Sequence, residues 1–177
     1  MIGTIALIGL VIATGLAYTI ITSYIEAEVT KQQLNQIAEH VALNLVKIAN
    51  LVNFANFLNN ATIMKVLRLP SDLGGKAYVI KLINETRQGR GCYVYVQLVV
   101  RKDVAASSPI PLNSTQTKLV LITDGEGTLQ IRGEKTNMIQ YSSTIYGGAQ
   151  DIVVWGWKKD ESTTLAGIGV WKSGGGY

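Results

Sequence analysis

Charge is missing from the start of this 177-residue chain, because no Asp, Glu, Lys, Arg or His occurs before Glu26. As a helix, residues 1–25 would be about 37 Å long, enough to cross a bilayer. A secretory signal peptide needs a basic first region and a shorter apolar stretch, and this segment has neither. Membrane segments normally carry basic residues on the cytoplasmic side. Either the membrane topology is unusual, therefore, or a short basic leader has been removed ahead of Met1.

Residues for catalysis are also scarce. The only histidine, His40, and the only cysteine, Cys92, lie far apart in the sequence, so no zinc-ligand spacing can be written. We expect His40 on a helix surface or interface and Cys92 as a buried free thiol. Gly125-Glu126-Gly127 lacks the third glycine of a dinucleotide-binding loop, and the acids of Asp160-Glu161 adjoin two lysines as a charged turn. We expect no enzyme, and no catalytic, cofactor or metal site.

Helix-breaking residues are absent from a long stretch, with no proline before Pro70 and no glycine between Gly15 and Gly74. After Glu26, apolar residues recur at spacings of three and four, as in an amphipathic helix. The sequence therefore predicts one continuous helix over residues 1–62, ending near Asn59-Asn60 and about 85 to 90 Å long. Such a rod needs partners outside its own domain, and the expected assembly interface consists of Ile2, Ile5, Ala6, Gly9, Leu10, Ala13, Leu16, Ala17, Ile20, Ile21, Leu34, Ile37, Val41, Leu45, Ile48 and Val52.

Small residues line one flank of the apolar stretch, since Gly9, Ala13 and Ala17 recur every fourth residue. Small residues at this spacing let helices approach closely in an apolar medium. Glycine and alanine are also common in membrane helices generally, so the pattern by itself leaves both interpretations open.

The period changes after a connector at residues 63–75, which contains Pro70 and a glycine pair. Beyond it, residues 76–177 are rich in Val, Ile, Tyr, Thr and Trp, which indicates β-strands. The sequence predicts an α+β fold, in which the long helix precedes an antiparallel β-sandwich-like domain of about seven strands that packs on the amphipathic half of the helix. A tight hairpin is expected at Asp124–Gly127 and a turn at Gly147-Gly148. The expected strands are residues 76–83, 92–102, 117–123, 128–133, 137–144, 151–158 and 164–172.

The basic surplus belongs to the C-terminal part, but its lysines and arginines are scattered, so we expect no nucleic-acid partner. Three sequons place possible N-glycosylation at Asn60, Asn84 and Asn113. Trp155, Trp157 and Trp171 fit either a sandwich core, which we favour, or a carbohydrate-binding platform.

An uncharged apolar stretch at residue 1, continuing without a break into an amphipathic helix and then a β domain, resembles a mature archaeal type IV pilin of the adhesion pilin and archaellin group. The resemblance covers about 60 residues in pattern and the remainder only in architecture. Bacterial members usually carry a glutamate where this chain has Ile5, which favours the archaeal branch. The resemblance implies cleavage by a prepilin peptidase, a precursor in the cytoplasmic membrane, and assembly by dedicated machinery into a homopolymeric extracellular filament, with surface adhesion as the expected role.

Two alternatives stay open at this stage. The chain is also compatible with an archaellum filament subunit, which differs in its motor coupling. It is compatible as well with a single-pass membrane protein whose extracellular β domain binds a partner, in which case residues 1–25 only anchor the chain.

Overall fold

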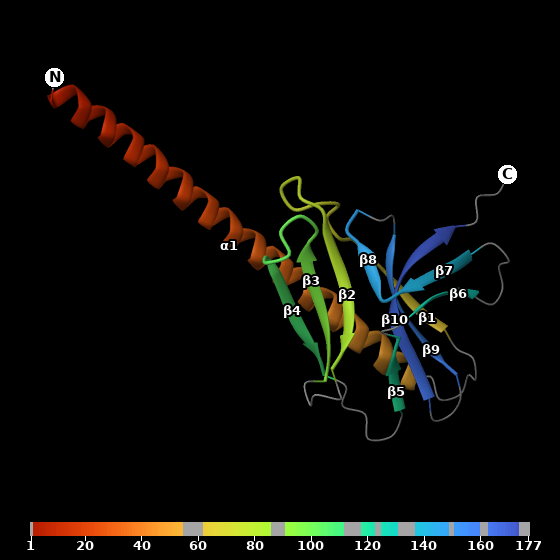
Figure 1. Cartoon of the computed structure of the whole chain (residues 1–177). Helices are drawn as coiled ribbons and strands as arrows, with labels where there is room; N and C mark the ends of the chain where they lie inside the picture. The colour runs from red at the N-terminus through yellow and green to blue at the C-terminus, as the bar shows by residue number, and fades with distance from the viewer. Residues whose placement is uncertain are drawn as a thin grey trace.

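The computed structural model describes residues 2–54, 62–85, 91–111, 118–122, 125–130, 137–148, 151–159 and 163–173. Within them, one long helix precedes ten strands in two sheets. The helix α1 (Ile2–Phe54) protrudes from the β domain with its N-terminal half and lies against both sheets with its C-terminal half (Figure 1). The predicted α+β class, with a long helix before a sandwich-like β domain, is confirmed.

The helix runs unbroken from the apolar stretch into the amphipathic half, as the absence of internal breakers predicts. Its expected end near Asn59-Asn60 lies outside the described residues. The expected boundaries need one correction, because residue 62, taken as helical, and the first part of the connector at 63–75 form a strand.

The larger sheet has six strands in the order β1-β9-β10-β7-β6, and β5 pairs with the first part of β10. All of its pairs are antiparallel except the parallel pair of β5 and β10. Its strands are β1 (Thr62–Leu67), β5 (Lys118–Leu121), β6 (Glu126–Gln130), β7 (Asn137–Ser142), β9 (Ile152–Lys158) and β10 (Thr163–Ser173).

The smaller sheet is antiparallel, in the order β4-β3-β2-β8. In β3, buried and half-buried side chains alternate along the strand, as expected where one face meets the core. Its strands are β2 (Tyr78–Asn84), β3 (Cys92–Leu98), β4 (Ala105–Ile110) and β8 (Thr144–Tyr146).

The sequence does not predict three of the strands. The strand β1 was assigned to the helix end and connector, β4 was not expected, and the segment 137–144 divides into β7 and the start of β8. The hairpin expected at residues 124–127 is wrong, because β5 pairs with β10 and β6 pairs with β7. The turn at Gly147-Gly148 does separate two strands, and it leads from one sheet to the other.

The main core lies between the C-terminal half of α1 and the two sheets. Because β9 crosses under the helix at Gly156, the two backbones approach closely. A Cβ atom at this position would lie only 3.0 Å from the Cγ2 atoms of Ile48 and Val52. The predicted packing of the β domain on the amphipathic half of the helix is confirmed.

A second apolar cluster covers the other face of the larger sheet, around the fully buried Trp155. The indole Nε1 of Trp155 donates a hydrogen bond to the carbonyl oxygen of Ile168 at 3.3 Å, and its ring lies against Gly167, where a Cβ would clash. Trp157 and Trp171 are half-buried on the same cluster. The core interpretation of Trp155 is confirmed, and a carbohydrate platform that includes its ring is excluded.

Candidate functional site

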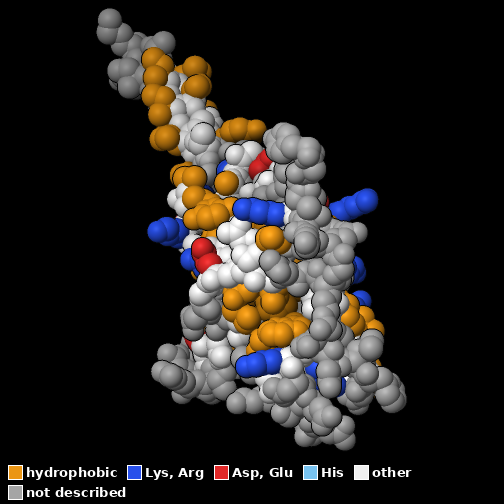
Figure 2. All heavy atoms as spheres, turned by 90° about the vertical axis from the view of Figure 1, so that its right-hand side faces the viewer, with side chains coloured by type: hydrophobic (Ala, Val, Ile, Leu, Met, Phe, Trp, Pro, Cys, Tyr) orange, Lys and Arg blue, Asp and Glu red, His pale blue; other side chains and the backbone are white. Residues whose placement is uncertain are grey.

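The protruding half of α1 carries most of the exposed large apolar side chains of the described chain. Figure 2 shows hydrophobic side chains along this protruding part of the helix. Within the described residues, α1 is long and apolar enough to cross a membrane, and its most apolar stretch of 18 residues is unburied. Eleven large apolar side chains are between 53% and 71% exposed, namely Leu7, Ile8, Leu10, Val11, Ile12, Leu16, Tyr18, Ile20, Ile21, Tyr24 and Ile25.

The side chains expected to make the assembly interface fall into two groups. In the protruding half, Gly9, Ala13 and Ala17 are exposed, as are Leu10, Leu16, Ile20 and Ile21. No atom lies within 4 Å of a Cβ built at Gly9, so this flank is open. The backbone of Ile2, Ile5 and Ala6 is helical, but their side chains are outside the description.

The second group, which consists of the six expected interface residues between Leu34 and Val52, requires a correction. These residues are only 0% to 6% exposed because the chain's own sheets cover them. A neighbouring subunit can therefore reach them only if the core opens. The amphipathic pattern identified a real apolar stripe, but its partner is the β domain of the same chain. The corrected residues are Leu34, Ile37, Val41, Leu45, Ile48 and Val52.

A different face of the docked half remains open to partners. Val29, Leu43, Leu51 and Phe54 are exposed there, Leu43 by 58% and Phe54 by 82%. With 3.6 residues per turn, these four side chains fall on one side of the helix. Leu7, Val11, Tyr18 and Ile25 continue the same line along the protruding half. We call these eight residues the outward stripe.

The hydroxyl groups of Thr14, Thr19 and Thr22 in the apolar stretch bond to the helix itself. Thr14 Oγ1 donates to the carbonyl oxygen of Leu10 at 2.9 Å, and Thr19 and Thr22 bond in the same way to carbonyls four residues earlier. A polar group without a partner would be costly in a dry environment. The stretch is therefore suited to surroundings without water, whether lipid or other helices.

Polar contacts hold the docked half of α1 in position on the larger sheet. The buried Asn44 accepts a hydrogen bond from Lys65 Nζ at 2.7 Å, and Asn53 Oδ1 accepts one from Thr164 Oγ1 at 2.7 Å. One bond joins α1 to β1 and the other joins α1 to β10, so a slide or rotation of the helix would break both. The protruding half continues the docked half as one unbroken helix.

The connector that follows β1 is also tied to the core. The Tyr78 side chain is fully buried, and its hydroxyl donates to the carbonyl oxygen of Pro70 at 2.6 Å. Burial raises the pKa of the Tyr78 phenol to about 12, and the nearby Asp72 carboxylate adds to the effect. At Asp103, a hydrogen bond from Arg101 lowers the pKa of the exposed carboxyl.

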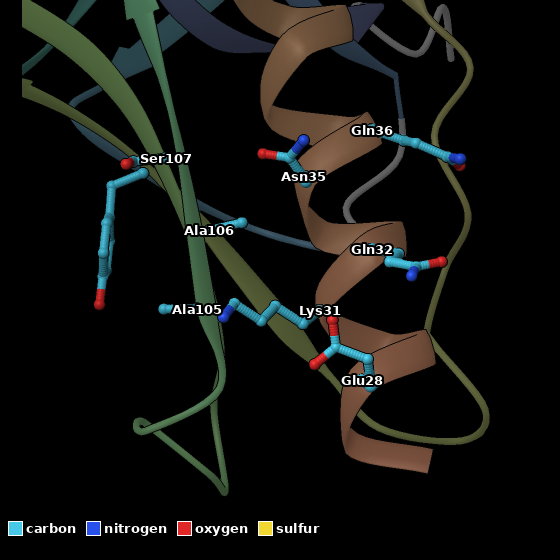
Figure 3. Close-up of a pocket in the computed structure, with 9 residues that line it drawn as sticks. Glu28, Lys31, Gln32, Asn35, Gln36, Ala105, Ala106 and Ser107 are labelled. Atoms are coloured by element: carbon cyan, nitrogen blue, oxygen red, sulfur yellow. The ribbon is translucent and has the colours of Figure 1, made fainter. Parts of the chain in front are cut away.

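An open groove of about 630 Å³ lies between exposed side chains of α1 and β4 and has a mixed polar and apolar lining. Lys31 and Asn35 point toward β4, whereas Gln32 and Gln36 point away from it (Figure 3). None of its lining residues is a histidine or cysteine. Elsewhere in the described chain, no group of three His, Cys, Asp or Glu side chains is placed to hold a metal ion.

The other sequence-selected residues are separate from the helix surface. Cys92 is buried and forms no disulfide, as predicted, and His40 is exposed on α1 beside the connector. Asn84 is exposed at the end of β2, while Asn60 and Asn113 lie outside the described residues. The acids Asp160 and Glu161 also lie outside them.

Comparison of the chain with known protein families, with curated proteins and with solved structures finds no match.

Proposed function

We propose that the chain is a structural subunit of an extracellular type IV pilin-like filament, which polymerises through its N-terminal helix and serves surface adhesion. The proposal takes the subunit to reside in the cytoplasmic membrane before assembly. A prepilin peptidase and the assembly machinery are its expected partners at that stage.

The apolar surface of the protruding helix requires a cover. Eleven large side chains there are more than half exposed. Burying the exposed part of each is worth about 1 kcal/mol, so together they offer about 10 kcal/mol, comparable with the whole stability of a typical domain. Lipid can supply this cover before assembly, and neighbouring helices can supply it in a polymer.

The outward stripe is the observation that favours assembly into a polymer over a simple membrane anchor. Leu43 lies eighteen residues beyond Ile25, which is about 27 Å along the helix. A membrane around residues 7–25 cannot reach Leu43, Leu51 or Phe54, whereas a second helix packed side by side can cover the stripe along its whole length. The single-pass anchor leaves these exposed side chains without a role.

The protruding helix also offers two different surfaces. By helical rotation, Gly9 and Ala13 project to the side of the rod that continues the docked face, and Ala17 projects about 100° from the outward stripe. Two unlike surfaces on one rod favour heterologous contacts, which generate open helical assemblies when they do not close into rings. Close approach at the small residues would strengthen such packing.

Removal of residues 1–25 tests the proposal. We expect the shortened chain to stay soluble and to form no filaments, while the full chain polymerises when detergent is withdrawn. Electron microscopy and sedimentation give the readout. Filaments formed by the shortened chain would contradict the proposal, and a full chain that stays a monodisperse monomer would favour the anchor.

A further inference from the structure

The turn between β3 and β4, residues 99–104, lies at the end of the β domain from which the apolar half of α1 emerges (Figure 1). The amide of Val99 donates to the carbonyl oxygen of Ala77 at 2.9 Å. The adjacent Lys76 places its Nζ 3.6 Å from Oε2 of Glu26, the first charged residue of the helix. These contacts place the turn beside the first charged turn of α1.

The close-up of the groove supports the same placement. Ala105 begins β4 near Lys31, and the turn that precedes Ala105 extends past Glu28 toward the beginning of the helix (Figure 3). The turn is thus the part of the smaller sheet nearest the apolar half of α1.

Its side chains combine an apolar tip with basic residues. Val100 is 83% exposed and Val99 is also exposed, and Arg101 and Lys102 follow directly. Arg101 pairs with Asp103 at 3.0 Å, and these two charges balance. Lys102 leaves the turn with a net positive charge. Exposed apolar side chains beside basic ones suit a lipid surface, where the apolar groups enter the headgroup boundary and the bases meet phosphate.

The level of a bilayer around α1 can be estimated from the helix. About 20 residues span the hydrocarbon core, and aromatic side chains favour its boundary with water. The exposed Tyr24 stands directly before the first charged turn, which places the boundary between Tyr24 and Glu28. The turn after β3 stands at this same level.

We propose that, while α1 is in the membrane, the turn 99–104 docks on the lipid surface, with Val99 and Val100 in the headgroup boundary and Lys102 at the phosphates. The inference rests on the proposed function in so far as that function requires a membrane-embedded precursor. Because the turn belongs to the β domain that packs on the helix, this second contact would set the tilt of the β domain over the bilayer. Entry into a filament would release the turn.

The test uses the full chain reconstituted into vesicles of phosphatidylcholine with phosphatidylglycerol. In a Cys92→Ala background, Val100→Cys carries the environment-sensitive dye NBD. Phe54→Cys is the matched control, because Phe54 is 82% exposed and lies at the far end of α1, about 42 Å from Glu26. Flotation of the vesicles reports insertion of the helix separately from the dye.

We expect the dye at residue 100 to shift its emission to the blue and to lose most of its quenching by aqueous iodide, with neither change at residue 54. Replacing Arg101 and Lys102 by glutamine should reduce the shift. Equal emission and quenching at both positions in floated vesicles would overturn the docking but leave the filament proposal standing. A chain that does not float with the vesicles would contradict the membrane-embedded precursor itself.

Discussion

Leu43 and Leu45 are two residues apart on α1, yet they face different surroundings. Leu45 is 1% exposed in the core between the helix and the sheets, and Leu43 is 58% exposed on the outward stripe. Leu45→Ala should therefore lower the free energy of unfolding by about 2 to 5 kcal/mol, through lost burial and the cavity left behind. Leu43→Ala should change it by less than about 0.5 kcal/mol, as at an ordinary surface position.

The substitution at Leu43, which has the smaller effect on stability, should have the larger direct effect on assembly. Leu43→Ala removes part of the outward stripe, so we expect it to raise the concentration of full chain needed for polymerisation without loosening the fold. Stability is measured by urea unfolding of the chain lacking residues 1–25, and assembly by sedimentation of the full chain. The same pair of substitutions thus separates the core of the subunit from its contact surface.

Two results would refute this reasoning. If Leu43→Ala destabilised the shortened chain as much as Leu45→Ala, the helix would not be docked through the face described above. If the stability pattern held but the Leu43 variant polymerised normally, the outward stripe would not be the contact surface between subunits.

Gly156→Val should lower stability by about 1 to 3 kcal/mol, since added methyl groups force the helix away from β9; an unchanged urea midpoint would show that the close approach is dispensable. The double-mutant cycle of Asn44→Ala and Lys65→Met should give a coupling of about 1 kcal/mol, and strict additivity would contradict the hydrogen bond between them. The folded state keeps the Tyr78 proton up to a pKa of about 12, from an ordinary 10.0, so stability should be full below pH 10 and fall by about 2 to 3 kcal/mol as the pH rises to 12. Urea unfolding of Tyr78→Phe should lose this component, and an identical pH dependence in the variant would contradict it.

The continuous helix was predictable because its cause is local. The chain has neither proline nor glycine from residue 16 to the end of α1, and the apolar spacing of three and four persists through Val52. The identity of the partner was not predictable from that spacing. An apolar stripe looks the same whether a sheet of the same chain or a neighbouring helix covers it.

The strands show the same limit. The segment Ala105–Ile110 has alanine, serine and proline in place of strong strand formers, and it forms β4 because an edge position tolerates Pro109 and α1 packs beside it. The segment Thr62–Leu67 follows the helix so closely that its pattern reads as a continuation. The pairing of β5 with β10 joins segments more than forty residues apart, which no local turn signal reveals.

At the candidate site, the apolar composition of residues 7–25 predicted the exposed surface directly. The outward stripe in the docked half was missed because Leu43, Leu51 and Phe54 are diluted by polar neighbours such as Gln36 and Lys47. The outward stripe becomes apparent when the apolar residues on the helix face opposite the Leu34–Val52 stripe are marked at 3.6 residues per turn.

Electron microscopy of the assembled full chain, at a resolution that places side chains, tests the central claim most directly. The account predicts helical filaments in which residues 7–25 and the outward stripe of each subunit contact α1 of its neighbours, while Leu45 remains in the core of its own subunit. Filaments held together by the β domains with α1 exposed, or a chain that never polymerises and stays a single-pass monomer in lipid, would contradict it.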